Sequence, residues 1–264
     1  MILFLHIEKS AGTSLAYYLK SKFGKKFIDL FPVENGKYIT NKDINSAIKY
    51  HRPEVLSSHK LFLDKINLEL FDKVIITMRD PYSRFVSHYN HLLELGRVNC
   101  LSFSDAIKHQ EFKNLQYSKC GGEKAKLIME KLYNSNKLII FNTTTFREDF
   151  DFFVGENFSS PKKNIRKDKL IDDNTIKNHE KIFKEENNLE YNFYENIELF
   201  QKPKRLEKTL KLENLESKKQ NVDISNNYRK YFSMPILILK KCLTSFKFLK
   251  TKNMSGYYVC TKKN

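Results

Sequence analysis

The chain is poor in the residues that interrupt or cross-link a fold. Its 264 residues include no Trp, 8 Gly and 6 Pro, which excludes collagen-like and low-complexity chains. Its four Cys form no CxxC pair and lie beside no His at metal-ligand spacing, so we expect reduced thiols, as in a cytosolic protein, and no metal site. With 41% hydrophobic residues, the chain can bury one sizeable core, which predicts one domain with an extension.

Long hydrophobic runs are missing as well. The apolar run at the N-terminus ends after five residues at His6, and no basic segment precedes it, so we do not expect it to be a signal peptide. The run MPILIL (234–239) is too short to span a bilayer. We therefore expect a cytoplasmic protein that is either soluble or peripheral on the inner face of the membrane.

Acidic residues are scarce near the C-terminus. Residues 201–264 hold 16 Lys and Arg against 4 Asp and Glu, and so carry +12 of the net charge of +16. Residues 1–200 are nearly balanced and need not bind nucleic acid, whereas the basic segment suits an anionic surface such as membrane lipid or a polyanion. We expect an α/β domain over 1–200 and a basic extension over 201–264, helical or partly disordered. Within the extension, residues 231–250 either lie on an anionic membrane face or pack as an ordinary amphipathic helix.

Strand and helix patterns alternate along residues 1–200. Continuous apolar runs bounded by turn residues predict strands, and apolar residues three and four apart predict helices. The predicted strands are 2–7, 55–62, 73–80 and 137–146; the predicted helices are 13–23, 41–51, 82–95, 103–110, 124–133, 147–158 and one or two within 173–201. This alternation predicts an α/β fold with a central parallel sheet flanked by helices.

The loop HIEKSAGTS (6–14) lies between the first predicted strand and helix and has the features of an anion site. Free backbone N–H groups at a helix start, together with the helix dipole, favour negative charge there. Gly12 permits close approach of a ligand to the backbone, Thr13 and Ser14 add hydroxyl groups, and Lys9 adds a positive charge. In a Walker A loop the Lys directly follows the last Gly, whereas here Lys9 precedes Gly12 by three residues.

This loop resembles the 5′-phosphosulfate-binding loop of sulfotransferases that use 3′-phosphoadenosine 5′-phosphosulfate (PAPS). In the carbohydrate branch of that family (sulfotransferase family 2, including heparan sulfate 2-O-sulfotransferase-like enzymes) the loop commonly reads HIPKTGGTS. Ala11, in place of Gly, is expected to be tolerated if its φ stays negative. Glu8, in place of Pro, is unfavourable beside an anion unless it points outward. The resemblance implies a three-layer fold like that of P-loop NTPases and donor binding by Lys9, Ser10, Ala11, Gly12, Thr13 and Ser14.

The segment MRDPYSRFVSHY (78–89) resembles the family's 3′-phosphate-binding element, RDPxxRxxSxY. Arg79 ends a predicted strand, where α/β sheets bind ligands, and its guanidinium can hold a phosphate through two parallel hydrogen bonds. Ser87 falls two turns into the following helix, and the resemblance assigns the 3′-phosphate to these two residues. Asp80 and Arg84, four residues apart, are expected to form an ion pair at the start of that helix.

A third segment, KKNIRKDK (162–169), resembles the loop that closes over the nucleotide. The resemblance makes Asn164, Arg166 and Lys167 candidates for contacts with phosphate or adenine. A solvated run of charge is the alternative interpretation of this segment.

Seven His are candidates for the base that accepts the proton of the acceptor hydroxyl, a role that suits an imidazole. Relatives with an HxxF-like stretch before the RDP strand use that His as the base, and HKLF (59–62) matches by position, which implies His59. A packing His is the alternative. Lys9 is expected to stabilise the charge on the sulfonate and the leaving phosphate. His6 is expected to shape the site, and His88 and His91 either line the acceptor cleft or pack.

The resemblance covers about residues 1–200. It implies an enzyme that transfers a sulfuryl group from PAPS, in line, to a hydroxyl of a carbohydrate or glycolipid. The product is adenosine 3′,5′-bisphosphate, and neither a metal nor nucleic acid takes part. Two alternatives stay open: a P-loop-like nucleotide or sugar kinase, and a non-enzymatic polyanion-binding protein.

Overall fold

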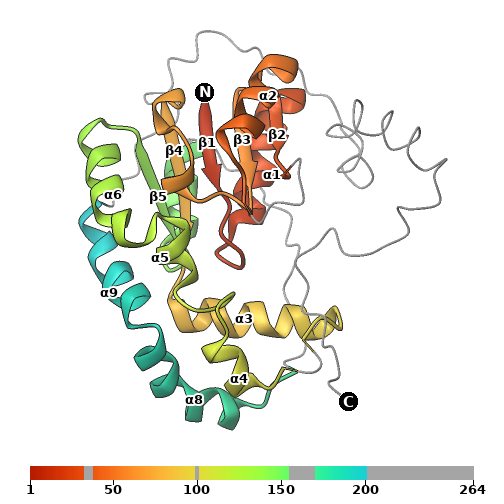
Figure 1. The fold of residues 1–264 in the computed structure, drawn as a ribbon, viewed down its shortest axis with the longest axis vertical. Helices are drawn as coiled ribbons and strands as arrows, with labels where there is room; N and C mark the ends of the chain where they lie inside the picture. The colour runs from red at the N-terminus through yellow and green to blue at the C-terminus, as the bar shows by residue number, and fades with distance from the viewer. Residues whose placement is uncertain (33–37, 99–100, 155–169, 201–264) are drawn as a thin grey trace, which may run out of the picture.

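The computed structural model describes residues 1–32, 38–98, 101–154 and 170–200. Its centre is a five-stranded, all-parallel sheet with the strand order β2-β3-β1-β4-β5 (Figure 1). The strands are β1 (Ile2–Leu5), β2 (Phe27–Asp29), β3 (Val55–Ser58), β4 (Lys73–Met78) and β5 (Leu138–Asn142). The prediction of an α/β fold with a central parallel sheet is therefore confirmed.

Helices connect the strands and cover both faces of the sheet. They are α1 (Gly12–Phe23), α2 (Asn41–His51), α3 (Pro81–Glu94), α4 (Phe103–Lys108), α5 (Leu115–Lys119), α6 (Ala125–Asn134), α7 (Phe146–Val154), α8 (Asp173–Glu186) and α9 (Asn188–Asn196). Short 3₁₀ turns occur at Gly24–Lys26, Leu63–Lys65, Leu68–Leu70, Gly122–Lys124 and Ile197–Phe200. Among the described residues, no helix combines the length and the apolar character needed to cross a membrane.

The two faces of the sheet carry separate cores. In β1, Leu3 and Leu5 pack in the cluster formed with α2 and α6, whereas Ile2 and Phe4 pack in the cluster formed with α1 and α7. Because both faces are covered, β1 is buried along its whole length, as expected for a central strand of a parallel sheet. The sheet and the helices on its two faces are the three layers predicted for the domain.

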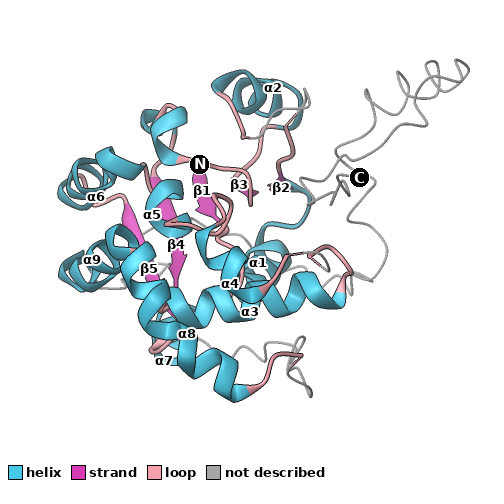
Figure 2. Cartoon of the chain, turned by 60° about the horizontal axis from the view of Figure 1, so that its bottom comes forward, coloured by secondary structure: helices cyan, strands magenta, loops and turns pink. Residues whose placement is uncertain are grey.

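A third core lies beyond the carboxyl ends of the strands. It joins α3, α4 and α8 through aromatic residues centred on Phe85, whose ring lies 4.8 Å from that of Phe183 and 5.2 Å from that of Phe103. Figure 1 shows these helices below the strand ends, and in Figure 2, where the bottom of that view comes forward, they lie in front of the sheet. This helical layer faces the carboxyl edge of the sheet, where the site residues are predicted from the sequence.

The structure differs from the sequence prediction mainly at short elements. The strand expected over 55–62 ends at Ser58, the three residues of β2 lie within 24–42, where a loop with strand pieces was expected, and α5, with five residues, was not predicted. Elements this short contain too few residues to show the two-residue alternation of a strand or the 3.6-residue period of a helix. The predictions for residues 201–264, including the extension and its membrane contact, lie outside the described residues.

Candidate active site

The pairing of three strands brings the two predicted motifs to one edge of the sheet. β1 pairs with β3 so that Leu5 stands opposite Ser58, and with β4 on its other side. His6 and His59, each one residue past its strand, therefore lie side by side, with ring centroids 3.9 Å apart. Arg79 follows β4 at the same edge. This is the carboxyl edge, where open α/β sheets bind ligands.

The loop between β1 and α1 has an unusual backbone. Lys9 and Ala11 have φ values of 64° and 62°, in the left-handed region, which disfavours residues other than Gly by roughly 1–2 kcal/mol. The condition under which we expected Ala11 to be tolerated, a negative φ, is therefore not met. The left-handed conformation of Ala11 comes directly before the first turn of α1, and a helix start preceded by such a turn presents backbone N–H groups to an anion.

Two small residues fix this loop from inside. The Ser10 hydroxyl is buried, donates to the Ile7 carbonyl (2.8 Å) and shares a hydrogen bond with Thr77 Oγ1 (2.7 Å). The Ser10 side chain thus anchors the loop to β4 and is not directed to a ligand. A Cβ at Gly12 would lie 2.2 Å from His6 Cδ2, so the imidazole fills the space that any side chain there needs. In the first turn of α1, Thr13 is exposed and Ser14 is partly buried.

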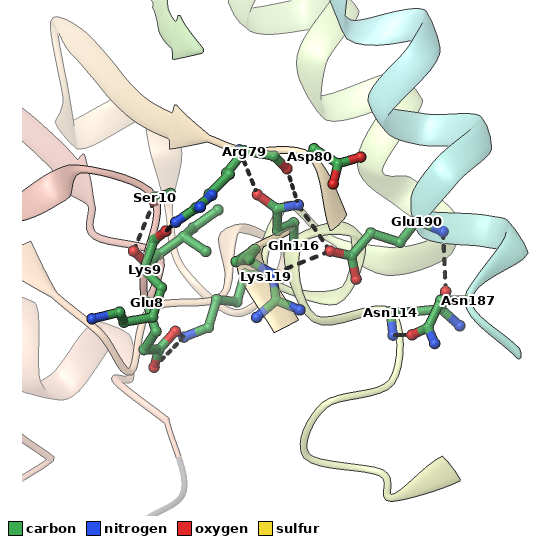
Figure 3. A network of polar contacts seen from close by, with 12 residues as sticks. Glu8, Lys9, Ser10, Arg79, Asp80, Asn114, Gln116, Lys119, Asn187 and Glu190 are labelled. Atoms are coloured by element: carbon green, nitrogen blue, oxygen red, sulfur yellow. Dashed lines mark hydrogen bonds and ion pairs between the residues drawn. The ribbon is translucent and has the colours of Figure 1, made fainter. Parts of the chain in front are cut away.

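Arg79 connects the second motif to the first. Its guanidinium Nη1 donates to the main-chain oxygen of Lys9 (3.3 Å), as Figure 3 shows. Gln116 of α5 holds the Arg79 backbone at both ends, accepting from its N–H (3.0 Å) and donating to its carbonyl (2.8 Å). Burial lowers the pKa of Arg79, an effect that Asp80 opposes. Ser87, the predicted partner of Arg79, is partly buried on α3.

The His59 ring is held in the tautomer that a base needs. Its Nδ1 lies 2.7 Å from the main-chain oxygen of His6. Because a carbonyl oxygen only accepts hydrogen bonds, Nδ1 must carry the hydrogen, and Nε2 of the neutral ring keeps its lone pair. Burial, and then the neighbouring His59, lowers the pKa of His6 well below its usual value. His6 is therefore neutral and does not repel a proton that arrives on His59.

The expected ion pair between Asp80 and Arg84 is wrong. The Asp80 carboxylate instead caps α3 by accepting from the Ser83 N–H (2.7 Å), which satisfies one of the free amides of the helix start. Arg84 is completely buried and donates from Nε to Glu190 of α9 (3.4 Å). Burial raises the pKa of Glu190, and Arg84 opposes that rise. Arg84 thus connects α3 to α9.

Glu8 and Lys119 form a pair that the sequence did not reveal. Glu8 does not point outward, because its Oε2 lies 3.2 Å from Lys119 Nζ. Burial alone would raise the pKa of Glu8, but the charges of Lys119, His59 and His88 outweigh it and lower the pKa to about 2. The Lys119 ammonium also donates to the main-chain oxygen of His59. A carboxylate in place of the family's proline was the one signal that a cation must lie near this loop.

The other two histidines proposed for the acceptor cleft have different surroundings. His88 packs edge-on against Phe112, with ring centroids 5.3 Å apart, and burial lowers its pKa to about 3. His91 lies at the surface, 3.7 Å from the Glu94 carboxylate. Asn164, Arg166 and Lys167 lie outside the described residues. No group of three or more potential metal ligands occurs in the part of the chain that the structure describes.

Comparison with known proteins agrees with this geometry. The model of the sulfotransferase family matches residues 1–248, which include both motifs and the whole sheet. No curated protein matches the sequence. The family match extends over nearly all of the chain, and the residues that carry the resemblance meet at the ligand-binding edge of the sheet. The chain therefore belongs to the sulfotransferase family, whose members are enzymes that transfer a sulfuryl group.

Proposed function

We propose that this sulfotransferase takes its sulfuryl group from PAPS and transfers it to a hydroxyl of a carbohydrate or glycolipid acceptor. The observation that carries the proposal is the meeting of His59, the loop and Arg79 at one edge of the sheet, where the Arg79 guanidinium bonds the loop at Lys9. The loop (6–14) supplies one cation, Lys9, and the corner after β4 (Arg79 and Asp80) supplies another, Arg79, whose guanidinium contacts the loop. A nucleotide with phosphate groups at both ends fits such a pair.

Each corner is suited to one end of the donor. The 5′ end is assigned to the backbone N–H groups that begin α1, to the Thr13 and Ser14 hydroxyls and to the Lys9 ammonium. The 3′-phosphate is assigned to Arg79 and Ser87. Asn164, Arg166 and Lys167 stay candidates for a loop over the nucleotide.

The reaction follows from the roles of two side chains. His59 Nε2 takes the proton of the acceptor hydroxyl while that oxygen bonds to sulfur. The bond between sulfur and the 5′-phosphate oxygen breaks in line, and the electron pair leaves with adenosine 3′,5′-bisphosphate. The Lys9 ammonium stabilises the negative charge that develops on the sulfonate and on the leaving phosphate. Products are the sulfated acceptor, the nucleotide and a proton carried away from His59.

Two measurements test the proposal. In calorimetry, adenosine 3′,5′-bisphosphate should bind at micromolar concentration, and ATP with Mg²⁺ or a generic oligonucleotide should bind far more weakly. Transfer of ³⁵S from labelled PAPS to a panel of polysaccharides, glycolipids and amines should then label a sugar hydroxyl. Preference for ATP with Mg²⁺ would favour a kinase, preference for the oligonucleotide would favour a polyanion-binding protein, and labelling of amines alone would overturn the acceptor class.

A further inference from the structure

The ammonium group of Lys119 connects three segments that lie far apart in the sequence. It donates to the main-chain oxygen of His59, pairs with the Glu8 carboxylate and lies 5.4 Å from the centre of the Phe62 ring. Figure 3 shows Lys119 extending from α5 to Glu8 beneath the loop. Its side chain is only 3% exposed. A charge thus lies in the interior, directly beside the residue that we assign as the base.

Stability does not explain why this charge is buried. Removing an ammonium or a carboxylate from water costs several kcal/mol per ion, and replacing a buried ion pair by apolar residues often leaves a protein as stable or more so. Burial indeed lowers the pKa of Lys119, against the influence of Glu8. What an apolar pair would lack is the hydrogen bond from Lys119 to the His59 carbonyl.

We propose that Lys119 is a positioning residue for His59 and that Glu8 holds Lys119 in place. His59 is then fixed at two points, its ring through the His6 carbonyl and its main chain through Lys119. Together these bonds set the direction of the Nε2 lone pair. The consequence for catalysis depends on the proposed function, whereas the effect on the His59 ring does not.

The test removes both charges of the pair at once. Lys119→Met alone would leave Glu8 buried without its partner and could unfold the protein, so the variant of choice is Lys119→Met with Glu8→Gln. We expect the full-length double variant to bind adenosine 3′,5′-bisphosphate as the wild type does, with an unchanged KM and a kcat lower by about 100-fold, the usual effect of a slight misplacement. The ¹⁵N shifts of the His59 imidazole should change from those of a fixed Nδ1–H tautomer to averaged values.

Lys73 provides the matched control. It too is a buried lysine whose ammonium donates to a main-chain oxygen, that of Asn136, but it lies at the first residue of β4, at the opposite edge of the sheet. We expect Lys73→Met to lower the melting temperature while kcat and the His59 shifts stay as in the wild type.

The two readouts separate this inference from the proposed function. A double variant with wild-type kcat and wild-type His59 shifts would overturn the role of Lys119. If the wild type transfers no sulfuryl group to any acceptor, the proposed function fails, and the imidazole shifts still decide the positioning role. Averaged His59 shifts in the double variant, beside fixed-tautomer shifts in the wild type, would support the positioning role of Lys119. Equal shifts in both proteins would overturn it.

Discussion

The helices that follow the two corners of the site, α1 after the loop and α3 after the turn at the end of β4, begin in opposite ways. At the corner after β4, Asp80 caps α3, and Pro81 occupies the first turn, where its missing N–H is harmless. At the loop, Ala11 stands at the N-cap of α1 in a left-handed conformation, with no side-chain cap. The Asp80 cap satisfies one of the free amides at the start of α3, whereas no side chain caps the start of α1, which suits that start to a ligand. The corner after β4 is therefore suited to hold an anion through the Arg79 side chain, whereas the loop offers backbone N–H groups beside the side chains of Lys9, Thr13 and Ser14.

The largest effect should come from His59, the proposed base beside the loop. His59→Ala removes the Nε2 lone pair, and we expect turnover to fall by about 10²–10⁴-fold, the usual contribution of general base catalysis. Binding of adenosine 3′,5′-bisphosphate, measured by calorimetry, should be unchanged because the corners remain. His51→Ala, on the partly buried last turn of α2, is the matched control and should keep normal turnover. Normal turnover in His59→Ala would show that the base is elsewhere.

The loop corner should also be the more sensitive to acid. The pKa of Glu8 is about 2 in the folded protein, against 4.5 ordinarily. Because the folded value is lower, ionised Glu8 stabilises the fold above about pH 4.5, and this contribution of roughly 2–3 kcal/mol is lost as the pH falls toward 2. Urea unfolding between pH 7 and pH 3 should show a smaller loss of stability in Lys119→Met with Glu8→Gln. Parallel curves for the two proteins would contradict the assignment.

At the capped corner, loss of a side chain should weaken binding and leave the backbone intact. Arg79→Ala removes charge-assisted hydrogen bonds worth about 1.5–3 kcal/mol, so the Kd of adenosine 3′,5′-bisphosphate should rise by about 10- to 100-fold. Adenosine 5′-phosphosulfate, which lacks the 3′-phosphate, should bind wild type and variant alike. An equal loss for both nucleotides would mean that Arg79 acts by holding the loop at Lys9 instead.

At the loop corner, the backbone should tolerate no added side chain at Gly12. The Cβ of Gly12→Ala would meet the His6 ring, and forcing atoms into a filled space costs about 1–3 kcal/mol. Urea unfolding should show that loss. Combining it with His6→Ala, which empties the space, should give less than the sum of the two single losses. Simple additivity would show that His6 and Gly12 do not compete for the same space.

The sequence predicted the parts of the site that depend on strand ends. Arg79 could be placed at the ligand-binding edge because it directly follows an apolar run, and parallel strands end at one edge. His59 came from the family resemblance, inside a strand that was expected to continue to Phe62. The residue types of the motif do not show the backbone conformation, so the left-handed φ of Ala11 was not predicted. Lys119 was missed because α5 has only five residues and its partner Glu8 lies 111 residues away. Arg84 was assigned to its neighbour Asp80 because local spacing does not show that a distant helix supplies Glu190.

The smallest effect tests whether the loop corner is indeed strained. Ala11→Gly removes the Cβ that disfavours φ of 62°, and after the greater entropy of Gly in the unfolded chain is subtracted, a gain of about 0.5–1 kcal/mol remains. The same change at Ala16, inside α1, should instead destabilise by about 1 kcal/mol. Melting temperatures should therefore move in opposite directions, by about 2–4 °C each. A fall in both would mean that the left-handed turn is not a source of strain, and the contrast between the two helix starts would then rest on capping alone.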